Sequence, residues 1–212
     1  MADKKISDFT AASSIADNDY IEIETAGGNS RKVTGANAKL SLSPLVLLSE
    51  VVTTSSATNV SFTSFSAGYR DLEVRVRGRG AKSATQVDIR IRFNGDTGGN
   101  YDNEFMQGIG SSILATNQAA QTSGFLGNMA AASAPSGVGD FLQLMIGDYR
   151  GTTFQKAAHW IGGAKGGTSA GNFNAENGSI WWRSTSAITQ IDVFPSSNAF
   201  VDDSVVSLYG RL

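Results

Sequence analysis

LEVRVRGR at residues 72–79 and QVDIRIRF at residues 86–93 are the two stretches that decide the fold class. In both, apolar residues alternate with polar or charged ones, a period of two that is typical of a β-strand with one buried face. Leu72, Val74 and Val76 lie on one side of the first strand, and glutamate and arginine side chains lie on the other. Each stretch therefore predicts a strand that covers a hydrophobic core with one face.

Further extended stretches surround these two. We expect additional strands at Asn59–Phe65, Phe141–Tyr149, Thr153–Ile161, Ser179–Arg183, Ile188–Phe194 and Val205–Tyr209. Turn-rich segments such as NGDTGGN separate the strands at intervals that are typical of sandwiches. The sequence thus predicts an all-β fold, an antiparallel jelly-roll-like β-sandwich over residues 49–212. Residues 108–139 show no clear period, and we expect a long loop there with one helical turn.

The N-terminal residues 1–34 form a separate module in this reading. Tyr20–Glu24 alternates apolar and acidic residues, TAGGNS follows as a turn, and Arg31–Val33 resumes the extended pattern. We expect a small β-hairpin in which Glu22 and Glu24 face Arg31 and Lys32. A lone two-stranded hairpin is marginal in water, so it needs a surface to dock on. Residues 35–48 read as a connector, in which Pro44 disfavours a continuous helix.

Composition narrows the classes of function. The chain of 212 residues has a net charge of −2, no cysteine and one histidine, and only 17% of its residues are charged. The charge gives no sign of nucleic-acid binding, and the lack of cysteine excludes disulfides and thiolate metal sites. MADKKISDFTAASS has no apolar h-region, and no run approaches a membrane span. We expect a protein made in a cytoplasm without a signal peptide, and no membrane insertion.

The candidates for catalysis are few. A Ser–His–Asp triad would have to use His159, but GIGSSI at 108–113 does not match a nucleophile elbow, and we interpret His159 as a packed or surface residue. GGAKGGTS at 162–169 lacks the lysine of a phosphate loop and is interpreted as a hairpin loop. Asp96, Asp102 and Glu104 offer oxygen ligands for calcium, although the spacing favours an ordinary turn. We therefore expect no enzyme, and no catalytic, cofactor or metal site.

The arginine stripe and the aromatic residues are the remaining candidates for binding. The stripe consists of Arg75, Arg77, Arg79, Arg90 and Arg92. We interpret it as a solvated sheet face with partial ion pairing; the alternative is a face for an acidic partner. Trp181 and Trp182 are adjacent in a strand, so one points to the core and the other to solvent or an interface. The candidate ligand or partner face is Arg75, Arg77, Arg90, Arg92, Tyr101 and Trp182.

Both ends of the chain resemble a known kind of protein. KISDFT at 5–10, DNDYIEI at 17–23 and GGNSRKVT at 27–34 resemble the N-terminal module of tailed-bacteriophage virion proteins, chiefly tail fibres, head fibres and minor structural proteins. FNGDTGGNY at 93–101, GSIWWRSTSAITQIDVF at 178–194 and VVSLYGRL at 205–212 are similar to β-sandwich domains of such proteins. Phe9 replaces the commoner leucine, and the long repeat of true fibres is missing, which favours a compact knob or capsid decoration.

The resemblance implies a virion component, usually a homotrimer, that contacts other capsid or tail proteins. Its attachment residues would be Ile6, Phe9, Tyr20, Ile21, Ile23 and Val33. The leading expectation is a non-enzymatic structural protein of the virion. The alternative is a module of a tail fibre that binds a host surface glycan through exposed aromatic side chains.

Overall fold

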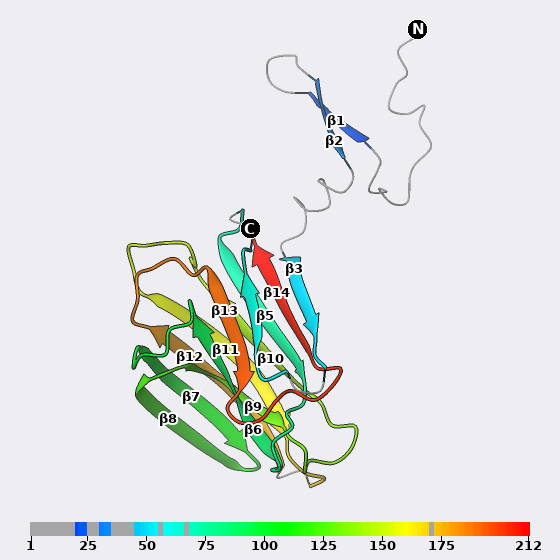
Figure 1. Cartoon of the computed structure of the whole chain (residues 1–212), viewed down its shortest axis with the longest axis vertical. Coiled ribbons are helices and arrows are strands. Elements are labelled where there is room, and N and C mark those ends of the chain that lie inside the picture. Colours follow the sequence, from blue (N-terminus) through cyan, green and yellow to red (C-terminus); the bar gives the residue numbers. More distant parts are fainter. Residues whose placement is uncertain (1–19, 25–29, 35–44, 55–56, 66–67, 170–171) are drawn as a thin grey trace. The chain divides into compact units, whose positions relative to one another are not determined.

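The computed structural model describes residues 20–24, 30–34, 45–54, 57–65, 68–169 and 172–212 (Figure 1). The chain divides into two compact units, Met1–Val46 and Leu47–Leu212. No α-helix occurs among the described residues, and the second unit consists of two sheets packed face to face. The expectation of an all-β, jelly-roll-like sandwich is confirmed. No helix in the described ranges has the length and apolar character needed to span a membrane.

The first unit contains the expected hairpin. Strand β1 (Tyr20–Glu24) pairs antiparallel with β2 (Ser30–Thr34). The register places Glu22 opposite Lys32, as expected, whereas Glu24 lies opposite Ser30 rather than a basic residue. Of the proposed attachment residues, Ile21 lies opposite Val33 in this register. Ile6 and Phe9 lie outside the described residues.

The second unit has a large sheet of eight strands. Its order is β3-β14-β5-β10-β11-β12-β7-β8, with β3 and β14 at one end and β7 and β8 at the other (Figure 1). The strands are β3 (Leu45–Val52), β14 (Val205–Arg211), β5 (Asp71–Gly78), β10 (Asp140–Ile146), β11 (Lys156–Lys165), β12 (Phe173–Trp182), β7 (Tyr101–Ile109) and β8 (Ser112–Gln121). Strand β3 includes the last four positions of the expected connector, residues 45–48.

A small sheet of four strands covers one side of the large sheet. Its order is β4-β13-β6-β9. The strands are β4 (Val60–Thr63), β13 (Gln190–Pro195), β6 (Gln86–Phe93) and β9 (Gly124–Ala130). Because the chain passes repeatedly from one sheet to the other, sequence neighbours such as β5 and β6 lie in different sheets.

The core fills the space between the sheets. Strands β5 and β6 supply the alternating apolar residues that the sequence indicated, and all of these are buried. Aromatic rings complete the core: Phe125 meets Trp160 edge to face at a centroid distance of 5.4 Å, and Phe105 lies 4.4 Å from Phe125. These ring contacts add to the burial of apolar side chains that stabilises the sandwich.

The prediction of a long loop at residues 108–139 is wrong. Strands β8 and β9 occupy most of it, and β7 precedes them. The sequences of β8 and β9 show no alternation of apolar and polar residues, because the two faces of each strand do not differ in burial in the usual way. Strand β8 is the edge of the large sheet and is exposed on both sides for most of its length, whereas β9 is buried on both sides. In β7 the buried positions include Asn103 and Gln107, so apolar and polar residues do not alternate.

Candidate functional site: the outer face of the large sheet

The side of the large sheet that points away from the small sheet is the candidate interaction surface, and we call it the outer face. Seven of the large hydrophobic side chains that remain exposed on the described residues lie on it: Met106, Ile113, Phe141, Met145, Ile161, Phe173 and Trp181. A large group of exposed apolar side chains on a soluble domain usually marks an interaction surface. The outer face is therefore the candidate interaction surface of the described residues.

Two rows of paired residues cross five strands in the middle of this face. In order from β10 to β8, the first row is Phe141, Gly163, Ala175, Gly108 and Ile113, and the second is Gln143, Ile161, Asn177, Met106 and Ala115. Neither row contains a charged side chain. Four of the ten positions are glycine or alanine, so few bulky side chains project from this surface. We call these two rows the apolar band.

A basic corner borders the apolar band on β5. Arg77 is exposed and lies opposite Phe141 in the register. Arg75, next to it on this face, donates to the buried carboxylate of Glu73 at 2.7 Å, and its guanidinium lies 4.6 Å from the ring centre of Tyr209. Arg75 is therefore held in place by the sheet, whereas Arg77 projects from it.

A hollow of about 360 Å³ adjoins this corner. Its lining consists of Glu50, Arg75, Arg77, Phe141, Val205, Ser207 and Tyr209. Glu50 accepts a hydrogen bond of 2.8 Å from the Ser207 hydroxyl. The hollow thus combines an apolar side with two arginines.

The diagonally opposite corner, on β7 and β12, is acidic and aromatic. Asp102 forms an ion pair with Arg183, with Nη2 and Oδ1 2.6 Å apart, and these hydrogen bonds hold the pKa of Asp102 below its ordinary value. Glu104 accepts a hydrogen bond of 2.7 Å from Asn117 and is exposed. Trp181 is 48% exposed, and its indole Nε1 donates to Gln155 at 2.6 Å. The outer face therefore has opposite charges at opposite corners of an uncharged band.

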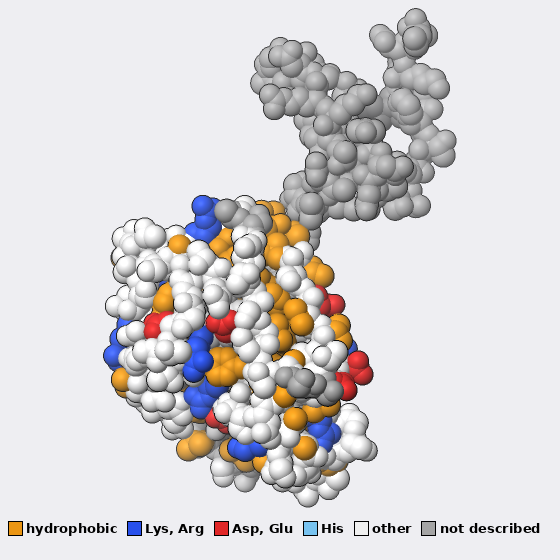
Figure 2. All heavy atoms as spheres, in the orientation of Figure 1, with side chains coloured by type: hydrophobic (Ala, Val, Ile, Leu, Met, Phe, Trp, Pro, Cys, Tyr) orange, Lys and Arg blue, Asp and Glu red, His pale blue; other side chains and the backbone are white. Residues whose placement is uncertain are grey.

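The structure divides the arginine stripe between two sheets. Arg75 and Arg77 belong to the large sheet, whereas Arg90 and Arg92 lie on the outer side of β6 in the small sheet. Arg90 pairs with Asp88 at 2.6 Å, and Arg92 lies 4.5 Å from the ring centre of Phe194. On the face of the sandwich that Figure 2 shows, basic and acidic side chains lie near one another among polar ones. The expectation of one common basic face is wrong, because the two strands belong to different layers.

Arg79, the last member of the stripe, has a structural role. Its guanidinium donates to four backbone carbonyls of one loop, those of Ala131, Ala132, Ala134 and Pro135. This residue fixes the loop that follows β9, and so it is not available to a partner.

Tyr101 and Trp182 are not part of an exposed face, which corrects the second half of the expected site. Tyr101 is 0% exposed and Trp182 is 3% exposed, because both side chains point between the sheets. Their rings stack at a centroid distance of 6.4 Å. Burial raises the pKa of the Tyr101 hydroxyl. The strand alternation did predict that one of the adjacent tryptophans is buried and the other exposed, and Trp181 is the exposed one.

The candidate catalytic and metal residues do not form a site. His159 is a surface residue on β11, with its Nδ1 3.4 Å from the Ser179 hydroxyl. Asp96, Asp102 and Glu104 each bind different partners, namely Trp182, Arg183 and Asn117. Among the described residues, no group of three or more His, Cys, Asp and Glu side chains is placed to hold a metal ion.

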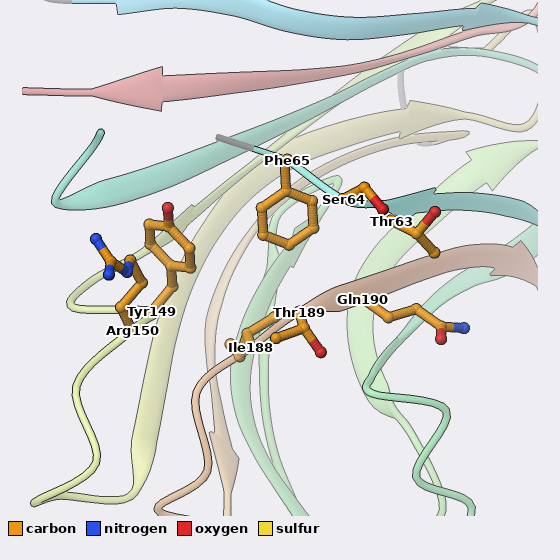
Figure 3. A pocket seen from close by; sticks show the side chains of 8 residues that line it. All are labelled: Thr63, Ser64, Phe65, Tyr149, Arg150, Ile188, Thr189 and Gln190. Atoms are coloured by element: carbon orange, nitrogen blue, oxygen red, sulfur yellow. The ribbon is translucent and has the colours of Figure 1, made fainter. Parts of the chain in front are cut away.

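A second hollow lies at the end of β4. It has a volume of about 450 Å³ and is lined by Thr63, Ser64, Phe65, Tyr149, Arg150, Ile188, Thr189 and Gln190 (Figure 3). The ring of Phe65 lies 5.8 Å from that of Tyr149, and Tyr149 and Ile188 belong to the core. Arg150 is the charged residue among those that line this hollow.

Comparison with known proteins gives no family. No family model matches the sequence, and no curated protein matches it either. Among solved structures, the chain is similar to an exo-inulinase from Aspergillus awamori, with a TM-score of 0.37, 10% identity, 91% of this chain covered and 34% of that one. It is also similar to the galectin LEC-6 of Caenorhabditis elegans, with a TM-score of 0.31, 11% identity and coverage of 77% and 95%. The chain thus spans about a third of the inulinase, and likenesses of this size assign no function to it.

Proposed function

We propose that the protein is a non-enzymatic structural subunit of a tailed-bacteriophage virion. In this proposal the N-terminal module docks on a capsid or tail protein, and the sandwich projects as a short fibre, spike or surface knob. The observation that carries it is the division into a hairpin unit and a sandwich unit, Met1–Val46 and Leu47–Leu212. That division agrees with the resemblance of the two ends of the chain to the module and the sandwich of such proteins.

Physical arguments support the same division of labour. A two-stranded hairpin is marginal in water without a surface to cover it, so β1 and β2 suit a docking element. The sandwich has its own core and places an uncharged band on its surface, as a protein that meets other proteins does. The subunit would be made in the host cytoplasm and assembled as a homotrimer, the state that the resemblance implies.

Deletion of residues 1–34 tests the proposal. We expect the shortened chain to fold and stay soluble, because β3 and the whole sandwich remain. Mixed with particles assembled without the protein, it should fail to incorporate, whereas the full chain incorporates and is seen by electron microscopy of the particles. A shortened chain that incorporates fully would contradict the proposal. Double substitution of Ile21 and Ile23 by lysine is the finer test of the hairpin itself.

Binding of a host glycan is a second candidate, and the exposed ring of Trp181 favours it. Sugar rings stack on exposed aromatic faces, and here the indole is oriented by its hydrogen bond to Gln155. Arg183, Asp102 and Glu104 lie on the same corner and offer hydrogen bonds to hydroxyl groups. The site differs from the one expected from the sequence, because Trp181 rather than Trp182 faces solvent.

An array of bacterial surface polysaccharides tests this candidate. We expect Trp181→Ala to weaken binding of the full chain at least tenfold. Phe173→Ala is the matched control, because Phe173 is an exposed aromatic residue at the opposite end of β12 from Trp181. Equal binding by both variants, or no binding by the wild type, would reject the glycan site while leaving the virion role unaffected.

A further inference from the structure

We propose that the apolar band is a contact between two copies of this chain, which pack outer face to outer face about a two-fold axis that passes near Ile161. The proposal concerns the sandwich alone. It adds to the proposed function a surface and a partner, a second copy of the chain. If N-terminal modules hold a homotrimer together, this contact joins sandwiches of neighbouring trimers.

The first argument is the anatomy of the face. Its centre is uncharged over five strands, with the amides of Gln143 and Asn177 beside Ile161. Charged and titratable side chains lie at its margins, including Arg77, His159 and Glu104. An apolar centre with a polar rim is the usual composition of a protein interface. Gly108 adds to this reading, because a Cβ at that position would have its nearest neighbour, the Ala175 carbonyl oxygen, 3.8 Å away. The fold leaves room for a side chain there, and the missing side chain keeps the band flat.

The second argument is the placement of Arg77 and Glu104, two exposed residues of opposite charge at opposite corners. From Ile161, Arg77 lies two strands away toward β14 and one residue pair toward Gly163. Glu104 lies two strands away in the other direction and one residue pair toward His159. Ile161 is therefore midway between the two charges, and it is 50% exposed.

A two-fold axis in the plane of the contact makes this arrangement self-complementary. With the axis at Ile161 and perpendicular to the diagonal, Arg77 of each copy faces Glu104 of the other copy, so the charge pair forms twice. The same rotation brings Phe141 toward Met106 of the second copy, and a thioether beside an aromatic ring is a favourable contact. An isologous contact of this kind closes on itself and gives a defined dimer rather than a filament.

The third argument is the size of the face. The two rows of the apolar band and the row beside them, which runs from Met145 on β10 to Asn117 on β8, span five strands about 4.8 Å apart and cover roughly 500 Å² per copy. Two such faces bury about 1,000 Å² in total, which is the lower limit for a specific interface. The contact is thus large enough to be specific and small enough to dissociate on dilution.

Cysteine cross-linking tests the position of the axis. The chain has no cysteine, so Ile161→Cys in the full-length protein introduces a single thiol. A thiol at a two-fold axis meets its own symmetry mate, and we expect a disulfide-linked dimer on mild oxidation, seen on a non-reducing gel. Thr63→Cys is the control, because Thr63 is exposed on β4 of the small sheet, on the opposite side of the sandwich, and it should stay monomeric. Equal cross-linking of both variants, or none of Ile161→Cys, would overturn the proposal.

Charge reversal tests the pairing and keeps the result independent of any effect of the cysteine. Arg77→Glu places like charges together twice, and we expect the dissociation constant from sedimentation equilibrium to rise at least tenfold. The double variant Arg77→Glu with Glu104→Arg should restore association, which a merely structural role of either residue would not produce. If the wild type sediments as a monomer at about 100 µM, or as a complex that Arg77→Glu leaves unchanged, another virion protein or a glycan covers the face. If these experiments contradict the dimer contact, the incorporation test of residues 1–34 is unaffected. The two proposals are therefore tested independently.

Discussion

Asp96 shows how a single turn residue secures the core of the sandwich. Its carboxylate accepts hydrogen bonds from the indole Nε1 of Trp182 at 2.7 Å, from the backbone N–H of Gly98 at 2.8 Å and from Asn100. Burial alone would raise the pKa of Asp96, but these hydrogen bonds outweigh it, so the pKa lies below the ordinary value of 3.8. One carboxylate thus fixes both the turn after β6 and the rotamer of a core tryptophan.

Replacing Asp96 by alanine should destabilise the sandwich. The loss leaves the Trp182 N–H without its partner and removes the turn bonds, which together cost about 1–3 kcal/mol. Because the folded-state pKa is lowered, the stabilisation is present above the unfolded-state pKa of about 4 and is lost as the pH falls through the folded-state value. Urea unfolding at a series of pH values measures this. The difference between wild type and variant should be full near neutral pH and shrink below about pH 4; a difference independent of pH would contradict the assignment.

Single residues also show how far burial can be predicted from the sequence. Alternation was enough to predict that Leu72, Val74 and Val76 are buried, because these positions depend only on the period of a strand. Tyr101 and Trp182 could not be placed in the same way. Tyr101 is the first residue of β7, a strand with no visible period, and the choice between the two tryptophans depends on which side of β12 faces the small sheet. The candidate site was therefore misplaced by one residue, from Trp181 to Trp182.

Strand β9 is the element that joins the two sheets. It is the edge of the small sheet, yet two buried carboxylates of the large sheet bind it. Glu176 of β12 accepts hydrogen bonds from the side-chain and backbone nitrogens of Asn128, each 2.8 Å long. Asp140 of β10 accepts from the backbone N–H of Ala130. Burial raises the pKa of Asp140, partly offset by the backbone N–H groups of Ala130 and Lys165.

Glu176→Gln should weaken this junction. The amide replaces an acceptor oxygen by a donor nitrogen that faces the N–H groups of Asn128 and Gln107, so a buried hydrogen bond is lost and donors oppose donors. We expect a loss of about 2–4 kcal/mol in the free energy of unfolding, measured by urea titration. Asp202→Asn, an exposed turn residue, is the control and should change the stability by less than about 0.5 kcal/mol. Equal effects of the two substitutions would argue against a buried network.

Strands β12 and β7 meet closely at Gly178. A Cβ there would lie 2.6 Å from the Cβ of Phe105 and 2.8 Å from the Trp160 ring. We expect Gly178→Ala to lower the free energy of unfolding by about 1–3 kcal/mol, because the aromatic core must shift. Gly108→Ala in β7 is the matched control, since it has room for the methyl group. Thermal unfolding at low protein concentration compares the two, and a larger loss for Gly108→Ala would contradict the packing described here.

For the molecule as a whole, the sequence predicted the fold class correctly but did not predict which sheet each strand belongs to. The alternation of apolar and polar residues in β5 and β6 was clear enough to predict a sandwich. The turn-rich segment between β1 and β2 was enough to predict the hairpin. Which sheet each strand joins is decided by contacts between residues far apart in the chain. For that reason the arginines of β5 and β6 were expected on one face. The apolar band was not expected at all, since it combines two positions from each of five strands.

The division into two units predicts how the molecule unfolds. Because the sandwich has its own core within Leu47–Leu212, the module of residues 1–34 should contribute nothing to its stability. We expect the thermal midpoint of the sandwich, followed by tryptophan fluorescence, to be the same within about 2 °C with and without residues 1–34. All three tryptophans, Trp160, Trp181 and Trp182, belong to the sandwich, so the signal reports on that unit alone. A clearly lower midpoint for the shortened chain would mean that the module stabilises the sandwich, and then it would not be free to dock on another virion protein.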